Sequence, residues 1–498
     1  MEQEQFVDSN GKVHFLQLRF HRESRLVYRV DSLEDLTKEN YQLLKLLIDH
    51  HATRQVPRLR ELMDYGMGIN HTVLDGLRRR REEDASDTRV AHNFCGNISL
   101  FKQGYIVGNP IQIAYADEKT DDVLHSVDKD NEVDGLNRDL VKDLSELGRA
   151  HDIVYRTKED KTKLRRLDPL DTFVIYDRTL SQHSIAAVRY YHRSLFSDDE
   201  KTVELWTDTH VIHFHYDGKQ LVEESVEPHY FEQIPITEYA NNNNRVSDYE
   251  PVLALVDLYD SAQSDTGNLM RDLSDAILLV TGRINFPASW SEEEKVDFIK
   301  TMRNLRFMLL QPPVDAEGKQ AGNVDAKYLI RSYDVQGSEA YKQRIADDIH
   351  QLTNIPNLND VHFSGTQSGE SMKYKLFGLE QERSTLESLF TKGLKRRYGL
   401  ITTIENKAGH TEPYEPQKLS VIFTPNKTLN ELDQVNMVKN LYGLVSEQTL
   451  LESVKDVTKI DPQTEKERLQ REKEDSQSMP RLSPTEEMSS VGDGDGEN

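Results

Sequence analysis

The chain has 498 residues, of which 86 are acidic and 62 are basic, so its formal net charge is −24. A chain of this length is expected to form several domains, because a single hydrophobic core does not grow to that size. The first ten residues are polar, unlike a secretory signal peptide, and no apolar run reaches the roughly 20 residues of a membrane-spanning helix. Cys95 is the single cysteine, which excludes an intrachain disulfide. We therefore expect a protein of the reducing cytoplasm that makes no membrane contact.

The excess of acidic side chains limits what the protein can do with DNA. A protein that holds DNA tightly presents clustered Lys and Arg, because the release of counterions from phosphates drives binding. Hydrophobic residues make up 36% of this chain and charged residues 30%, and the balance of charge is acidic. This argues against a static DNA binder but is compatible with a protein past which DNA slides.

The N-terminal part predicts a mixed α/β domain. Residues 36–80 have apolar side chains at helical spacing, with a break at Pro57, and they lead into four arginines at 78–81. The arginine run fits a solvated helix end, where cations interact favourably with the macrodipole, or a contact with DNA or an acidic neighbour. An alternating strand at residues 111–115 and an acidic, helix-prone segment at 117–148 follow.

Short segments rich in aromatic and β-branched residues predict a β-rich region between residues 170 and 240. The expected strands are residues 171–176, 185–190, 202–206 and 210–216. The Asp-Gly pair at 217–218 is a hairpin signal. Four asparagines at 241–244 then mark a break before a different architecture.

A long helix is expected after this break. Ser247 and Asp248 are good N-cap residues, and apolar side chains recur at helical spacing up to Gly282. About 31 residues correspond to roughly 45 Å at about 1.5 Å per residue. Gly267 interrupts the pattern for no evident reason, which leaves the straightness of the helix open.

Residues 283–336 predict a small insertion between this helix and the next. Its expected elements are strands at 284–286, 307–310 and 326–331 and a helix at 291–302. The second helix is capped at Ser338 and stops at Ile355, because the following proline disfavours the helical conformation. The remaining expected elements are a polar loop at 357–368, a third long helix at 369–406, a strand at 419–423, helices to 474 and a disordered acidic tail.

Sequence motifs of catalysis are missing. The chain has no phosphate-binding loop, no dinucleotide fingerprint and no H-E-x-x-H pair. His213 and His215 share one face of their expected strand, but a metal site would need a third ligand, so a solvated strand face is favoured. Ser368 lacks the spacing of a nucleophile elbow, and capping of the next helix explains it better. We therefore expect no enzymatic activity, no metal and no cofactor.

The order of these elements, together with several short sequences, resembles one protein family. The sequences are RVAHNF at 89–94, GYIVGNP at 104–110, TNIPNLND at 353–360, FSGTQSGE at 363–370, GLVSEQTL at 443–450 and a charged helix at 465–474. Together they resemble the portal proteins of long-tailed bacteriophages that infect Gram-positive bacteria. The likeness runs in the family's order from about residue 35 to 475.

The resemblance implies a multidomain α+β portal fold and a closed ring of about a dozen identical subunits with heterologous contacts. Long stem helices, an α/β wing, a small β-containing clip and a helical crown make up this fold. The implied domains are a wing at 1–246, a stem helix at 247–282, a clip at 283–336, a second stem helix at 337–354, a tunnel loop at 355–370, a long wing helix and returning strand at 371–428, a crown at 429–475 and a disordered acidic tail at 476–498.

The resemblance also implies a function and a set of partners. The ring would form the channel at a capsid vertex for packaging and ejection of double-stranded DNA. It would bind the large terminase, a head-completion adaptor, and the major capsid and scaffolding proteins. It would be assembled in the host cytoplasm and remain in the virion.

The expected tunnel loop offers hydrogen bonds to phosphates and little fixed charge, which suits weak contacts that are independent of base sequence. The loop residues expected to face DNA are Asn357, Asn359, His362, Ser364, Thr366, Gln367 and Ser368, with Lys373 as a nearby cation.

Two other functions are compatible with parts of this pattern. A capsid scaffold or adaptor without a DNA channel would share the long helices, because apolar stripes fit any helical interface. A metal-dependent DNA-processing enzyme would need an ordered cluster of carboxylates or histidines around a metal, and no spaced acidic cluster stands out in the sequence.

Overall fold

The structure of the chain is a computed structural model. The residues it describes are 2–7, 9–77, 86–194, 197–274, 277–281, 286–287, 289–304, 312, 317–320, 325–329, 334–357, 376–426, 439–446, 449–451 and 465–471. The chain divides into two compact units, Met1–Asn426 and Lys427–Asn498. In the second unit, residues 439–441, 449–451 and 465–471 are helical.

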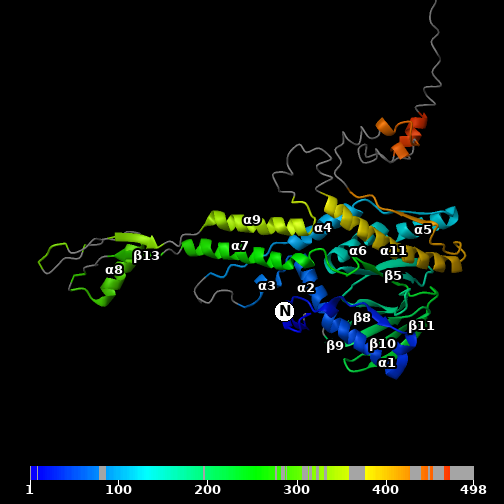
Figure 1. The fold of residues 1–498 in the computed structure, drawn as a ribbon, viewed down its shortest axis with the longest axis horizontal. Coiled ribbons are helices and arrows are strands. Elements are labelled where there is room, and N and C mark those ends of the chain that lie inside the picture. Colours follow the sequence, from blue (N-terminus) through cyan, green and yellow to red (C-terminus); the bar gives the residue numbers. More distant parts are fainter. Residues whose placement is uncertain are drawn as a thin grey trace, which may run out of the picture. The chain divides into compact units, whose positions relative to one another are not determined.

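A six-stranded sheet forms one layer of the first unit. Its order is β11-β10-β9-β8-β7-β3, and β3 is parallel to β7 while the other neighbours are antiparallel. Helix α1 packs on one face (Figure 1) and buries Leu36, Leu44 and Ile48 there. The elements are β3 (Tyr28–Val30), α1 (Leu33–His50), β7 (Thr172–Asp177), β8 (Ser184–Ser194), β9 (Ser197–Trp206), β10 (His210–Tyr216) and β11 (Leu221–Pro228).

The four strands expected between residues 171 and 216 are confirmed as β7 to β10. The expected hairpin is confirmed as well, since Gly218 has a φ of 81° and β10 pairs with β11 across it. The expected break at Pro57 is a π-helical turn, His51–Gln55, with the proline in the first turn of helix α2. A proline is tolerated there because its missing N–H would have no partner within the helix.

A second layer packs on the other face of the sheet. The three-stranded sheet β12-β5-β6 contributes Ile153, Leu167 and Ile236 to a core shared with Val174 and Ala187 of the larger sheet. The largest core lies among the helices and the two-stranded sheet of β4 and β15. The elements are α2 (Val56–Gly66), α4 (Phe94–Val107), β4 (Gln112–Tyr115), α5 (Glu118–Asp130), α6 (Val133–Leu147), β5 (Arg149–Arg156), β6 (Thr162–Leu167), β12 (Ile236–Ala240), α11 (Phe377–Lys407) and β15 (Leu419–Ile422).

Two long helices, α7 (Leu253–Ser274) and α9 (Val335–Leu352), run alongside each other (Figure 1). The chain between them forms a small insertion, in which β13 (Ile277–Thr281) pairs with β14 (Asp325–Leu329) and helix α8 spans Glu292–Asn304. The helix expected at 291–302 and the strand expected at 326–331 are thus confirmed. The strands expected at 284–286 and 307–310 fall largely outside the described residues.

Three predicted helix boundaries are wrong. The helix expected to be capped at Ser247 and Asp248 begins instead with the 3-10 turn Glu250–Val252, whose N-cap is Tyr249, and α7 follows from Leu253. The helix predicted to reach Gly282 ends at Ser274, and Ile277–Thr281 forms β13 instead. These β-branched and leucine side chains also fit helical spacing, but a distant antiparallel partner strand favours the extended form. Helix α9 is capped by Asp334, which accepts a hydrogen bond from the N–H of Gly337, and not by Ser338.

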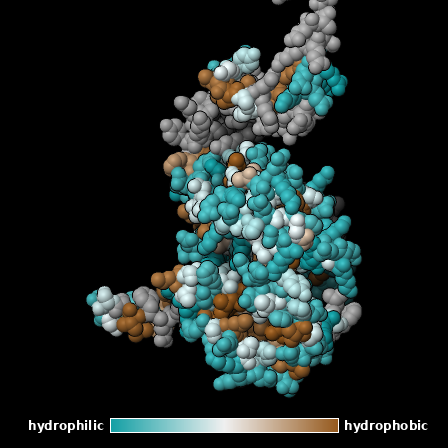
Figure 2. Space-filling view, turned by 90° about the vertical axis from the view of Figure 1, so that its right-hand side faces the viewer, coloured by the Kyte–Doolittle hydropathy of each residue, from teal (hydrophilic) through white to brown (hydrophobic). Residues whose placement is uncertain are grey.

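The surface agrees with the composition. On the face shown in Figure 2, hydrophilic residues dominate the described part of the first unit, and hydrophobic residues form separate patches. An N-terminal hairpin, β1 (Glu2–Val7) and β2 (Val13–Leu18), carries three exposed apolar side chains, Val7, Val13 and Phe15.

Candidate functional site

The helix pair α7 and α9 is the candidate functional site, because the predicted channel lining falls on it. Ile345 and Ile349 of α9 are buried, and both belong to the largest core, together with Val256 of α7. The buried Lys342 donates a hydrogen bond from Nζ to Gln263 Oε1 of α7 at 2.8 Å. The two helices are therefore joined by apolar packing and by the polar contact between Lys342 and Gln263.

Residues 86–92, which precede α4 in the chain and which we call the strap, lie along α7 and are hydrogen-bonded to it. Three main-chain N–H groups of the strap donate to side chains of α7, namely His92 to Asp260 (3.0 Å), Val90 to Ser264 (3.0 Å) and Thr88 to Asn268 (2.6 Å). The acceptors are four residues apart on a helix, about 6 Å at about 1.5 Å per residue. The donors are two residues apart, about 6.6 Å in an extended segment. The two spacings match, so side chains on one face of α7 can accept a hydrogen bond from every second N–H group of the strap.

The strap explains Gly267, which had no evident reason in the sequence. A Cβ atom at this position would lie 3.1 Å from Cγ2 of Thr88, tighter than ordinary van der Waals contact. Glycine in a helix costs about 1 kcal/mol relative to alanine. Its presence here lets the strap lie close to the helix.

Two aspartates one turn apart anchor the first half of α7. Asp257 accepts hydrogen bonds from Arg19 Nη1 (2.7 Å) and Tyr65 Oη (2.5 Å). Asp260 accepts from Asn70 Nδ2 (2.7 Å) and, besides its main-chain bond, lies 2.8 Å from His92 Nδ1. Burial raises the pKa of Asp260, and the hydrogen bonds from His92 and Asn70 oppose that effect.

The segment that leads into α7 is fixed by buried charges. Glu250 lies 2.5 Å from Arg58 Nη2 and 2.6 Å from Arg25 Nη2, and the side chain of Arg58 is 1% exposed. Burial alone would raise the pKa of Glu250, but hydrogen bonds and charge from the two arginines lower it below its ordinary value. Removing one partner of such a pair leaves a buried charge without compensation, so the start of α7 is held firmly on α2.

The described segments on either side of the predicted tunnel loop, the end of α9 and the start of α11, contact each other. Asn354, after α9, donates from Nδ2 to Glu382 Oε1 of α11 at 2.7 Å. A Cβ atom at Gly378 would lie 2.1 Å from Asn354 Oδ1, so only glycine fits there without displacing the asparagine. Ile355 and Leu379 are both buried in the largest core. The residues that follow α9 and the first turns of α11 are therefore fixed against each other.

Of the predicted tunnel-loop residues the structure describes one, the half-buried Asn357. Seven predicted residues lie outside the described part, namely Asn359, His362, Ser364, Thr366, Gln367, Ser368 and Lys373. The arginine run at 78–81 lies outside it too. The strap and the anchoring aspartates were not predicted from the sequence.

A family model described as "Phage portal protein, SPP1 Gp6-like" matches residues 45–479, which is most of the chain. The chain belongs to this phage portal protein family. It is 21% identical over 445 residues to the portal protein of Bacillus phage SPP1, an alignment that covers 84% of each chain. A solved structure titled "Neck of native GTA particle computed with C12 symmetry" is 10% identical at a TM-score of 0.44 and covers 79% of this chain and 91% of its own. As a portal family member, the chain is a subunit of the ring at a capsid vertex.

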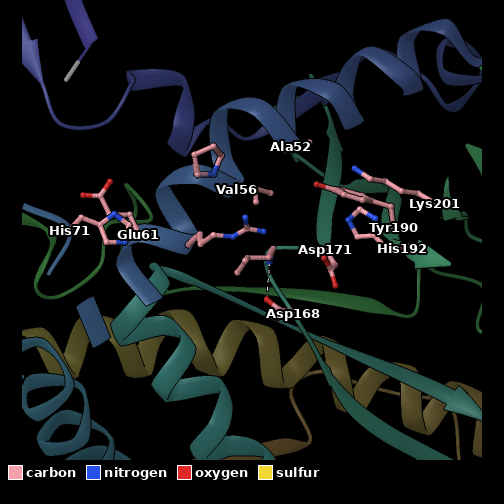
Figure 3. Close-up of a pocket in the computed structure, with 12 residues that line it drawn as sticks. Ala52, Val56, Glu61, His71, Asp168, Asp171, Tyr190, His192 and Lys201 are labelled. Carbon is pink, nitrogen blue, oxygen red and sulfur yellow. Dashed lines mark hydrogen bonds between the residues drawn. The ribbon is translucent and has the colours of Figure 1, made fainter. Parts of the chain in front are cut away.

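One cavity in the described part of this portal chain has a charged lining. A cavity of about 590 Å³ lies between α2 and the strands β8 and β9 (Figure 3). Its charged lining is of mixed sign, with Glu61, Asp168, Asp171, Arg60, His71, His192 and Lys201. Burial and the neighbouring Asp168 raise the pKa of Asp171, while Asp168 accepts a hydrogen bond from the N–H of Leu170 at 2.9 Å.

Metal ligands and membrane-spanning segments are considered for the same described residues. No group of three or more His, Cys, Asp or Glu side chains among them is placed to hold a metal ion, so His213 and His215 gain no third ligand there. Of the helices that the structure describes, none combines the length and apolarity needed to cross a membrane.

Proposed function

We propose that the ring formed by this chain is the channel through which double-stranded DNA enters the capsid during packaging and leaves it during ejection. In this proposal α7 and α9 are the stem, 283–336 is the clip, and 355–370 is the tunnel loop. The first 246 residues, with 371–428, are the wing, and 429–475 are the crown. Partners of the ring are the large terminase, a head-completion adaptor, and the major capsid and scaffolding proteins.

The observation that carries the proposal is the anchorage of the helix pair. The helix pair is held by the strap, by Asp257 and Asp260 of α7, and by the contact of Asn354 with α11. These contacts support a rigid element that can keep its shape while a charged polymer moves past it. The exposed carboxylate of Asp347 on α9, which forms no ion pair within the described part of the chain, would repel phosphates. Weak repulsion suits a conduit, because any attraction to phosphate would have to be broken at each step of movement.

A charge reversal on α9 tests the proposal. The variant Asp347→Lys presents an additional lysine to DNA in every subunit, so rings should retain DNA at low salt and pack less of it. Because each phosphate contact adds to binding and its salt dependence, we expect roughly tenfold less DNA in nuclease-protected particles at low salt. The defect should shrink as the salt concentration rises.

A matched control places the same charges elsewhere. Asp122→Lys changes one exposed aspartate of α5, outside the helix pair, and should pack like wild type. If the α9 variant also packs normally, α9 does not line the path of DNA.

A further inference from the structure

A groove separates helix α11 from strand β15, and it has a volume of about 630 Å³. Its lining, which defines the α11–β15 groove, is Ser384, Glu387, Ser388, Thr391, Lys392, Lys395, Val421, Ile422 and Phe423. Hydroxyl groups and lysines form the helical wall, and three consecutive apolar residues form the other. Neither the helix pair nor the tunnel loop contributes to this groove.

The strand beside the groove has an open edge. β15 pairs with β4, and the described residues supply no third strand to that sheet. The N–H of Ala116 donates to the carbonyl of Lys418 at 3.0 Å, which fixes the alternation of the ladder. Ser420 and Ile422 therefore direct their main-chain groups to β4, whereas Val421 directs its N–H and C=O away from it. An exposed edge of this kind can accept another strand.

The charge of the groove is positive once its ion pairs are taken into account. Glu387 is paired with Arg383. Lys392 and Lys395 are exposed, and no ion pair within the described part of the chain engages either ammonium group. Ile422 is 51% exposed and supplies an apolar contact at the strand. Two uncompensated lysines are notable in a chain with a net charge of −24.

We propose that the α11–β15 groove binds an extended acidic segment of another protein, which adds to β15 as a third strand. Main-chain hydrogen bonds to Val421 supply affinity, and carboxylates placed against Lys392 and Lys395 supply specificity. Alternate side chains of the bound segment are apolar and cover Ile422. The acidic tail at 476–498 matches this description poorly, because its acidic run GDGDGE at 492–497 alternates with glycine, which offers no apolar side chain to cover Ile422. The site does not depend on the passage of DNA.

Binding of a defined peptide to the full-length chain tests the proposal. The probe is an acetylated nine-residue peptide that alternates glutamate with valine, followed by fluorescence anisotropy. Lys392→Glu/Lys395→Glu should weaken binding roughly tenfold, equivalent to about 1.4 kcal/mol. Val421→Pro should abolish it, because proline has no N–H to donate. Lys407→Glu on the same helix lies outside the groove and should bind like wild type.

The outcomes separate this site from the channel. A peptide with lysine in place of glutamate should not bind, and a photoreactive group on the bound peptide should label α11 or β15. Equal binding by wild type and the double variant, no binding by wild type, or labelling elsewhere would each overturn the proposal. So would cross-linking of Ser388 in assembled rings to the chain's own 476–498 or to a second copy. None of these results changes whether rings package DNA.

Discussion

Asp260 offers the sharpest test of how the α7 helix is held. Its side chain is fully buried and accepts from the main-chain N–H of His92, from the side chain of Asn70, and from His92 Nδ1 when that nitrogen is protonated. Replacement by alanine leaves the first two donors buried without a partner, whereas the imidazole of His92 is 37% exposed and can turn to water. Each unsatisfied buried donor costs about 1–3 kcal/mol, so with two such donors Asp260→Ala should weaken the attachment of the strap by about 2–6 kcal/mol.

The assay must be local, because unfolding of a multidomain chain does not give one free energy. Hydrogen exchange of the strap amides reports local opening directly, and Val90 and His92 should lose protection by at least tenfold, which corresponds to about 1.4 kcal/mol. In Asp260→Asn the protection of these amides should lie between wild type and the alanine variant. The new Oδ1 can still accept one hydrogen bond, but the new NH2 group would face the NH2 group of Asn70, and both are donors. Asp347→Ala, an exposed carboxylate on α9, should change the same amides by less than about 0.5 kcal/mol. Wild-type protection of Val90 and His92 in Asp260→Ala would refute the strap as an anchored element.

Two further predictions concern helix α7 and strand β5. In Gly267→Leu the helix gains intrinsic propensity, but the side chain must displace Thr88, so the amide of Thr88 should exchange faster. Gly267→Ala, whose Cβ would lie 3.1 Å from Cγ2 of Thr88, should raise exchange of the same amide by less than leucine does, and a protected Thr88 in the leucine variant would contradict the close packing. His151 is fully buried, and burial lowers its pKa to about 4. The unfolded histidine takes up a proton below about pH 6.5 while the folded one does not, so this stability is complete above pH 6.5 and is lost as pH falls, by about 2 kcal/mol at pH 5. Hydrogen exchange of the β5 amides at pH 7 and pH 5, corrected for the intrinsic exchange rates, should therefore show a smaller pH dependence of local stability in His151→Leu, and an unchanged dependence would place the acid sensitivity elsewhere.

The sequence predicted those features whose cause is local. Four strands between residues 171 and 216, the turn at Gly218 and the helix α8 follow from short runs of suitable side chains. The family itself was also reached from the sequence, through short motifs that keep their order. The end of α7 at Ser274 was not, because the partner strand β14 lies about fifty residues further along the chain and periodicity alone cannot choose between helix and strand.

The anchorage of α7 left a weaker trace in the sequence. Asp260, Ser264 and Asn268 recur every four residues, so they lie on one face of the helix and can bind a polar partner there. Their partners are main-chain N–H groups of the strap, and main-chain donors leave no mark in side-chain chemistry. Gly267 follows the same logic, since the strap that requires it lies about 180 residues away in the chain.

Electron microscopy of the assembled chain tests the central claim most directly. The account predicts closed rings with an axial hole wide enough for a double helix, and it places α7 and α9 around that hole. A dimer, a solid particle, or a ring in which this helix pair lies on the outer rim would contradict it.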